Sequence, residues 1–238
     1  MKFSVPFTNY DFYAYLVSGL AVLVAWDWAL GTAELLRADI PWPKVLVIGV
    51  LAYVLGEIIA SLSGFVIENL SSHLFRHPKD ELWADENQKK KYKIRWFGRY
   101  YQPLTNRVRA IIDSKLGRSF PEFGEMSIGD RYECVYAIVR RDSDTAARLE
   151  ESRNQYALAR NISMAALLNI PVFAIAYLDI EKRGDAELLF GLSLLIFGGM
   201  WLRFMKFYST FYAQAFRAYL ADGADSNRKQ TSAGLVET

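Results

Sequence analysis

Residues 45–67 read VLVIGVLAYVLGEIIASLSGFVI and contain a single charged side chain, Glu57. A helix needs about 20 mostly apolar residues to cross the roughly 30 Å hydrocarbon core of a bilayer. This stretch is therefore long enough to span a membrane as one helix. It also sets the interpretation of the chain as a whole, because the near-neutral net charge of +2 would otherwise suggest an ordinary soluble domain.

Three further stretches show the same pattern. Residues 12–31 contain one charge, Asp27, and residues 162–178 and 188–202 contain none. The last stretch becomes long enough if the long side chain of Arg203 reaches the interface, although a core helix of a soluble protein is an alternative for it. We predict an all-α polytopic membrane protein with transmembrane helices at 12–31, 45–67, 162–178 and 188–205.

These helices divide the chain into four predicted parts. Residues 1–68 and 161–208 form two transmembrane hairpins. Residues 69–160 form a basic helical cytoplasmic domain with 18 basic and 13 acidic residues. Residues 209–238 form a cytoplasmic tail, whose end is rich in Ser, Gly and charge and is expected to be disordered.

The basic residues predict the orientation. Of the 28 lysines and arginines, 24 lie on the side of the termini and the central domain. The other four lie in the two short loops: Arg37, Lys44, Lys182 and Arg183. The positive-inside rule therefore places both termini and the central domain in the cytoplasm.

Polar residues within the spans are candidate functional residues. Glu57 and Ser61 are four apart and share one helix face, which Gly64 and Glu68 continue at helical spacing. A carboxylate near the middle of a bilayer faces a partner or a water-filled path, so Glu57 either lines an ion path or accepts a buried hydrogen bond between helices. Asn169 lies near Pro171, where we expect a kink.

Small residues predict close helix packing at two places. Ala52, Gly56, Ala60 and Gly64 recur every four residues beside the Glu57 face. Such a small-xxx-small stripe lets another helix approach closely. Gly191 and Gly198 are seven residues apart and predict a second close contact in the fourth span.

The central domain is predicted to be helical. Apolar spacing predicts a helix at 105–116 that ends at Gly117, and Ser127 with Asp130 resembles a capping box. Residues 143–177 contain no Gly, and no Pro before Pro171. We therefore expect one long helix that leaves the cytoplasm and becomes the third span.

The segment 89–101 has the densest positive charge and is interleaved with aromatic residues. Its candidate ligand-binding residues are Lys89, Lys90, Lys91, Lys93, Arg95, Trp96, Arg99 and Tyr100. Cations neutralise phosphates and aromatic rings stack on unpaired bases, which suits a nucleotide or a single-stranded oligonucleotide. An anionic membrane surface, or a solvated segment without a ligand, fits the same composition.

Nothing in the sequence supports catalysis or a cofactor. No nucleophile elbow, P-loop, HExxH or dinucleotide motif is present, so we expect no enzymatic activity and no catalytic residues. His73 and His77 are four apart on a predicted helix, but they lack an evident third ligand, and we expect no metal. The lone Cys134 excludes an internal disulfide.

Short segments of the chain resemble a known group of proteins. They are Asn9–Leu16, Tyr53–Glu57 with the following Ser-Leu-Ser-Gly, and Arg148–Glu151 leading to 159–162. They resemble bacterial four-helix transmembrane effectors of anti-phage defence, and in particular the membrane effector of the Hailong system. The resemblance implies a homo-oligomeric ion channel in the bacterial inner membrane that works beside a nucleotidyltransferase partner and depolarises the cell in abortive infection.

We therefore expect a pore-forming effector embedded in membrane lipid and gated by a nucleotide or oligonucleotide at the cytoplasmic domain. Two alternatives remain open. The protein could be a non-conducting scaffold or signalling subunit whose basic segment binds anionic lipid, or it could be a small transporter.

Overall fold

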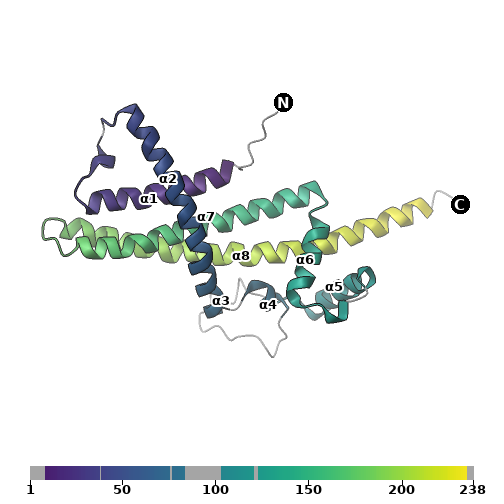
Figure 1. The fold of residues 1–238 in the computed structure, drawn as a ribbon. Helices are drawn as coiled ribbons and strands as arrows, with labels where there is room; N and C mark the ends of the chain where they lie inside the picture. Colours follow the sequence, from purple (N-terminus) through teal and green to yellow (C-terminus); the bar gives the residue numbers. More distant parts are fainter. Residues whose placement is uncertain (1–8, 38, 76, 84–102, 121–122, 235–238) are drawn as a thin grey trace. The chain divides into compact units, whose positions relative to one another are not determined.

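The structure is a computed structural model and describes residues 9–37, 39–75, 77–83, 103–120 and 123–234 (Figure 1). All regular secondary structure in these ranges is helical. The elements are α1 (Asn9–Ala29), η1 (Glu34–Leu36), α2 (Trp42–Ser63), η2 (Gly64–Glu68), α3 (Asn69–Phe75), α4 (Pro78–Leu82), α5 (Asn106–Ser119), η5 (Phe123–Glu125), α6 (Ile128–Val139), α7 (Ser143–Ala176) and α8 (Arg183–Gly234).

Four helical stretches in this part of the chain are long and apolar enough to cross a membrane. They are Phe12–Ala29, Trp42–Leu82, Ser143–Ala176 and Arg183–Ala221. Each contains one of the four predicted spans or most of it. The structure thus confirms the predicted all-α class and the four apolar helices.

The chain forms two compact units. The first unit contains Met1–Ser71 and Asn154–Met205, and the second contains Ser72–Arg153 and Lys206–Thr238. The chain passes between the units within α7 and within α8, so each of these two helices contributes residues to both units.

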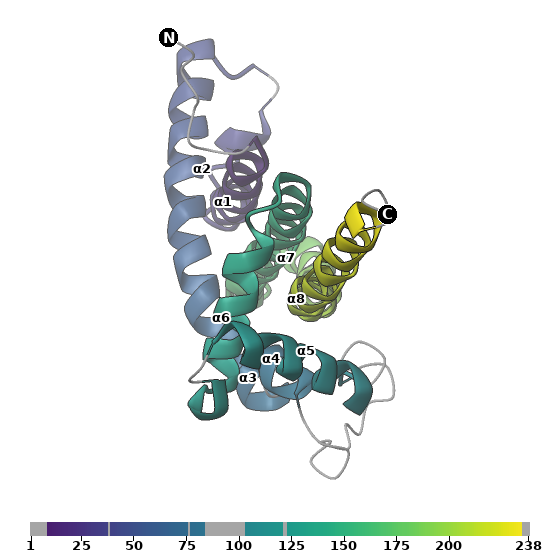
Figure 2. The same ribbon diagram turned by 90° about the vertical axis from the view of Figure 1, so that its right-hand side faces the viewer.

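In the first unit, α1 and α2 pack closely through glycine (Figure 2). A Cβ atom placed on Gly19 would overlap the backbone oxygen of Ala52, and one placed on Gly56 would overlap the backbone oxygen of Tyr15. Ala52 and Gly56 are buried. The small-residue stripe therefore does mediate a close helix contact, and its partner is α1.

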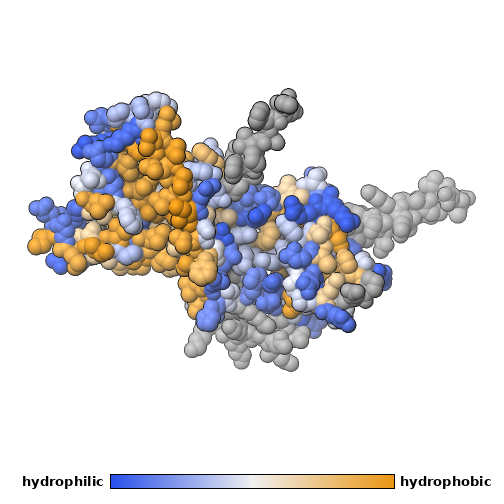
Figure 3. Space-filling model, viewed as in Figure 1, coloured by the Kyte–Doolittle hydropathy of each residue, from blue (hydrophilic) through white to orange (hydrophobic). Residues whose placement is uncertain are grey.

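The opposite side of α2 is apolar and exposed. Its exposed hydrophobic residues are Val45, Leu46, Val47, Val50, Leu51, Val54, Ile58 and Leu62. On the face drawn in Figure 3, hydrophobic atoms cover α2 along its length. This exposed apolar surface is suited to contact with lipid hydrocarbon rather than with water.

The second predicted glycine contact is wrong. A Cβ atom placed on Gly191 or on Gly198 would have no described atom within 4 Å outside its own turn of helix. These glycines therefore lie in open space along α8 and do not hold a neighbouring helix of this chain close.

The second unit is built around the late part of α8, beyond the predicted span. The buried apolar residues of this segment are Tyr208, Phe211, Ala215, Phe216 and Tyr219, and Ser209 is buried beside them. The apolar residues stand at helical spacing and so form one face of the helix. The ring of Phe216 lies 4.7 Å from that of Trp83, and the ring of Tyr212 lies 4.5 Å from that of Tyr132 in α6.

This part of α8 overlaps the segment predicted to be a separate tail, residues 209–238. α8 runs from Arg183 to Gly234, and the apolar face of residues 208–219 gives this part of the helix a core to pack against. The predicted division of the chain at residue 209 and the predicted disorder of its end stay predictions.

Local end signals account for the shorter helices. Ser127 caps α6, because its hydroxyl accepts a hydrogen bond from the backbone N–H of Asp130 and the Asp130 carboxylate accepts one from the N–H of Ser127. The predicted capping box is therefore confirmed. Thr105 caps α5 by the same chemistry. The predicted stop at Gly117 is wrong, since α5 continues to Ser119, where Phe120 turns extended.

The predicted long helix is confirmed. α7 runs from Ser143 to Ala176 as one α-helix and contains Pro171 in its interior. The helix is not ended by this proline, which removes only one backbone donor.

Replacing Gly56 with alanine tests the α1–α2 contact. We expect Gly56→Ala to lower the free energy of unfolding by about 1–3 kcal/mol, because the added methyl group must force the two backbones apart. Gly49→Ala is the matched control, since a Cβ at Gly49 meets nothing within 4 Å. Thermal unfolding in detergent measures both. Equal midpoints for the two variants would contradict the close approach.

Candidate functional site

The candidate intramembrane residues Glu57 and Ser61 lie on the outward side of α2. Both are exposed, and they continue the row formed by Val50 and Val54. No residue in the described part of the chain forms a hydrogen bond or an ion pair with the Glu57 carboxylate. A carboxylate thus stands near the middle of an apolar helix face without a partner from its own chain.

Asn169, the third candidate residue, lies elsewhere. It is 7% exposed in α7, and its Nδ2 donates a hydrogen bond to the backbone oxygen of Ala21 at 3.3 Å. Its Oδ1 is buried and accepts no hydrogen bond from the described residues. Asn169 therefore ties α7 to α1, and the structure does not bring it together with Glu57 and Ser61.

A buried polar network joins α7 to the end of α2, and sequence reasoning did not find it. Ser63 Oγ donates a hydrogen bond to Asn161 Oδ1 at 2.8 Å and accepts one from Arg160 Nε at 3.0 Å. The Arg160 guanidinium also pairs with the Glu68 carboxylate. Ser63 and Asn161 are almost completely buried.

The signals for this network were present in the sequence but separated. Arg160 and Asn161 follow each other at the start of the third span, and Ser63 and Glu68 stand at the end of the second. Their pairing spans more than 90 positions, so no local pattern could indicate it.

A π-helical turn, η2, lies at the same place. It covers Gly64–Glu68 between α2 and α3. A π turn holds about one residue more than an α turn and therefore rotates the following residues backward around the axis. The predicted continuation of the Glu57 face to Glu68 is wrong for this reason, since Glu68 is turned toward Arg160 and Glu57 remains outward.

A further contact fixes the helix beyond η2. The indole Nε1 of Trp201 in α8 donates a hydrogen bond to Ser71 Oγ in α3 at 2.8 Å. Ser71 is buried. Polar side chains therefore connect the end of α2 to α7 and connect α3 to α8, in addition to apolar packing.

The two histidines are not arranged as metal ligands. α3 ends at Phe75, so His73 and His77 do not share a helix face. His77 Nδ1 accepts the N–H of Lys79, and its Nε2 is hydrogen bonded to the Tyr208 hydroxyl at 2.9 Å. Among the described residues, no group of three or more His, Cys, Asp or Glu side chains could hold an ion.

The eight candidate ligand-binding residues of segment 89–100 lie outside the described residues. Their predicted role in ligand binding stays a prediction.

The described residues define a class of protein: an all-helical fold with four membrane-length apolar helices and polar side chains within them. No protein-family model matches the chain, and no curated protein and no solved structure matches it either.

Replacing Arg160 tests the buried network. We expect Arg160→Met to destabilise the protein by about 1–3 kcal/mol, because it leaves the Glu68 carboxylate and the Ser63 hydroxyl without their cation. Glu150→Gln, which removes an exposed i,i+3 pair with Arg153, is the control and should cost less than about 1 kcal/mol.

A double-mutant cycle that combines Arg160→Met with Glu68→Gln measures the coupling free energy between the two side chains, by thermal unfolding in detergent. The double variant should lose less stability than the sum of the two single variants. Strict additivity would show that the two side chains do not interact.

Proposed function

We propose that the protein is a homo-oligomeric membrane protein that conducts ions along a path lined by the Glu57 face of α2. The supporting observation is the exposed Glu57 carboxylate on an otherwise apolar helix surface. A charge at the centre of a bilayer costs on the order of 3 kcal/mol on insertion scales, so such a side chain avoids lipid. The described part of the chain does not cover Glu57, and we infer that other copies of the chain and water do.

An assembly around this face would satisfy both requirements. Identical α2 helices arranged about an axis would place a ring of Glu57 carboxylates and Ser61 hydroxyls along a shared path. Rings of acidic side chains favour cations. The apolar residues beside them would contact neighbouring subunits or lipid.

In this proposal the basic central region, residues 69–160, controls whether the path is open or closed. An anionic ligand, of the nucleotide or oligonucleotide class, would bind there and shift a closed–open equilibrium. The continuity of α7 and α8 through both units supports this coupling, because a rigid helix carries a displacement at one end to the other.

The resemblance to defence effectors supplies the wider setting. On that basis, the protein acts in the bacterial inner membrane with cytoplasmic termini. An adjacent nucleotidyltransferase makes its signal, and opening depolarises the infected cell. A non-conducting scaffold, in which Glu57 accepts a hydrogen bond inside a sealed assembly, is the competing outcome of the tests below.

Neutralising Glu57 tests conduction. We expect Glu57→Gln to reduce cation selectivity and single-channel conductance in planar bilayers, since the amide keeps the shape and removes the charge. Glu34→Gln is the control, because Glu34 pairs with Arg37 and Lys44 in the loop between α1 and α2. Channels with unaltered selectivity and conductance in Glu57→Gln would remove this residue from the path. A wild-type protein that never conducts would favour the scaffold.

Cysteine cross-linking tests the assembly. In a Cys134→Ser background, we expect Ser61→Cys to form disulfide-linked dimers in oxidised membrane vesicles, because copies of α2 meet at this face. Leu195→Cys, at a 72% exposed position of α8, should remain monomeric. Efficient cross-linking at Leu195 with none at Ser61 would place the interface on α8 instead.

A further inference from the structure

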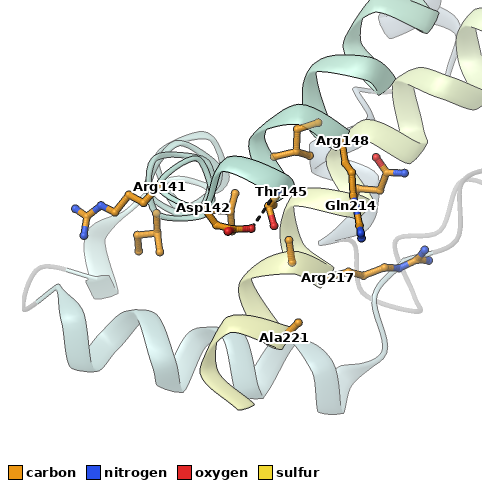
Figure 4. Close-up of a pocket in the computed structure, with 11 residues that line it drawn as sticks. Arg141, Asp142, Thr145, Arg148, Gln214, Arg217 and Ala221 are labelled. Carbon is orange, nitrogen blue, oxygen red and sulfur yellow. Dashed lines mark hydrogen bonds between the residues drawn. The ribbon is translucent and has the colours of Figure 1, made fainter. Parts of the chain in front are cut away.

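A hollow of about 720 Å³ lies within the second unit, between the α6–α7 junction and the late part of α8 (Figure 4). Arg141, Arg148 and Arg217 line it, together with Asp142 and Gln214. Its volume falls within the range of about 300–1,000 Å³ that is common for small-molecule sites.

The hollow carries excess positive charge. Within the described part of the chain, no carboxylate forms an ion pair with Arg141, Arg148 or Arg217. The one acidic lining residue, Asp142, accepts a hydrogen bond from the backbone N–H of Thr145 at 2.9 Å, at the start of α7. Hydrogen bonds from Thr145 hold the pKa of the Asp142 carboxyl below its usual range. Three cations therefore face one carboxylate that is already engaged.

The three arginines reach the hollow from different elements. Arg148 stands on α7, Arg217 on α8 and Arg141 between α6 and α7, and all three are exposed. Figure 4 shows Arg141 and Arg217 extending away from each other, with Arg148 and Gln214 between them. Because three cations and one engaged carboxylate surround it, the hollow favours an anion.

One neutral donor is fixed in advance. Ser152, which is 8% exposed, donates a hydrogen bond from Oγ to Gln214 Oε1 at 2.6 Å. The carboxamide is thereby oriented, and its Nε2 donates no hydrogen bond to another described residue. Planar guanidinium groups donate pairs of N–H hydrogen bonds, which phosphate oxygens accept, and an amide N–H can donate a further one.

The remaining lining residues indicate which parts of a ligand the hollow does not recognise. Apart from Thr145 they are aliphatic, and no aromatic ring from the described residues lines the hollow. A nucleobase would have nothing to stack on, so recognition would rest on phosphate groups and their charge. This chemistry differs from that of segment 89–101, where aromatic residues alternate with cations.

We propose that this hollow binds a ligand carrying two or more phosphate charges through Arg141, Arg148, Arg217 and Gln214. The proposal gives a binding site for the ligand that controls the conducting path in the proposed function. It rests on the proposed function only for the effect of binding on conduction, and not for binding itself. A free polyphosphate-bearing molecule and an anionic lipid headgroup share this chemistry.

The test measures binding on the full-length protein without any measurement of current. Inorganic pyrophosphate is titrated against protein in zwitterionic-lipid nanodiscs by calorimetry. We expect Arg148→Gln and Arg217→Gln each to weaken binding roughly tenfold, the loss of one charge-assisted contact. Arg118→Gln is the control, because Arg118 is exposed in α5 and does not line the hollow. Circular dichroism verifies that all variants are folded.

A parallel arm identifies the source of the phosphate. Nanodiscs containing phosphatidylglycerol replace the zwitterionic ones, and thermal stability is compared between wild type and variants. Arginine-dependent pyrophosphate binding supports a free ligand. Arginine-dependent stabilisation by the anionic lipid alone supports a headgroup. Absence of both effects, or equal effects in Arg148→Gln and wild type, overturns the proposal. Pyrophosphate binding to a protein that never conducts would leave this site standing and refute the proposed function.

Discussion

The contact between α1 and α2 at Gly19 and Gly56 determines much of the membrane unit. Because two backbones touch there, α2 has a single side that can face its own chain. That side takes Ala52, Gly56, Ile59 and Ser63, and the remaining circumference must face something else. The outward direction of Glu57 is thus a consequence of backbone proximity on the other side of the same helix.

The polar network at the end of α2 complements this contact. Glycine packing sets how closely α1 and α2 approach, while Arg160, Ser63 and Asn161 set how α7 meets them. Apolar packing in lipid provides little directional preference, since lipid tails are as apolar as the side chains they replace. Hydrogen bonds between buried polar groups supply that preference, both at the end of α2 and where Asn169 contacts Ala21 in α1.

Much of the architecture could be predicted from the sequence, because hydrocarbon imposes a simple length rule. The four apolar helices, the unbroken α7, the α1–α2 stripe and the Ser127–Asp130 cap each depend on nearby residues. What could not be predicted depends on partners far apart in sequence. The Arg160–Glu68 pair and the arginines of the hollow come from separate segments, and Gly191 and Gly198 fit a packing pattern for which the described part of this chain provides no neighbouring helix. The apolar period of Phe211, Ala215 and Tyr219 is visible in the sequence, but the polar and charged residues that follow it at 222–229 favoured reading the whole stretch as a tail.

The π turn at Gly64–Glu68 also constrains how this chain can change over time. A π turn differs from an α turn by one residue, so deletion of a single residue there would restore a regular helix. Every position beyond the deletion would then turn by about 100°. Glu68 would leave Arg160, and Ser71 would leave Trp201. A substitution within this turn changes one side chain, whereas a change of length displaces both of these contacts together, so descendants of this sequence should keep its residue count here even where the residues themselves differ.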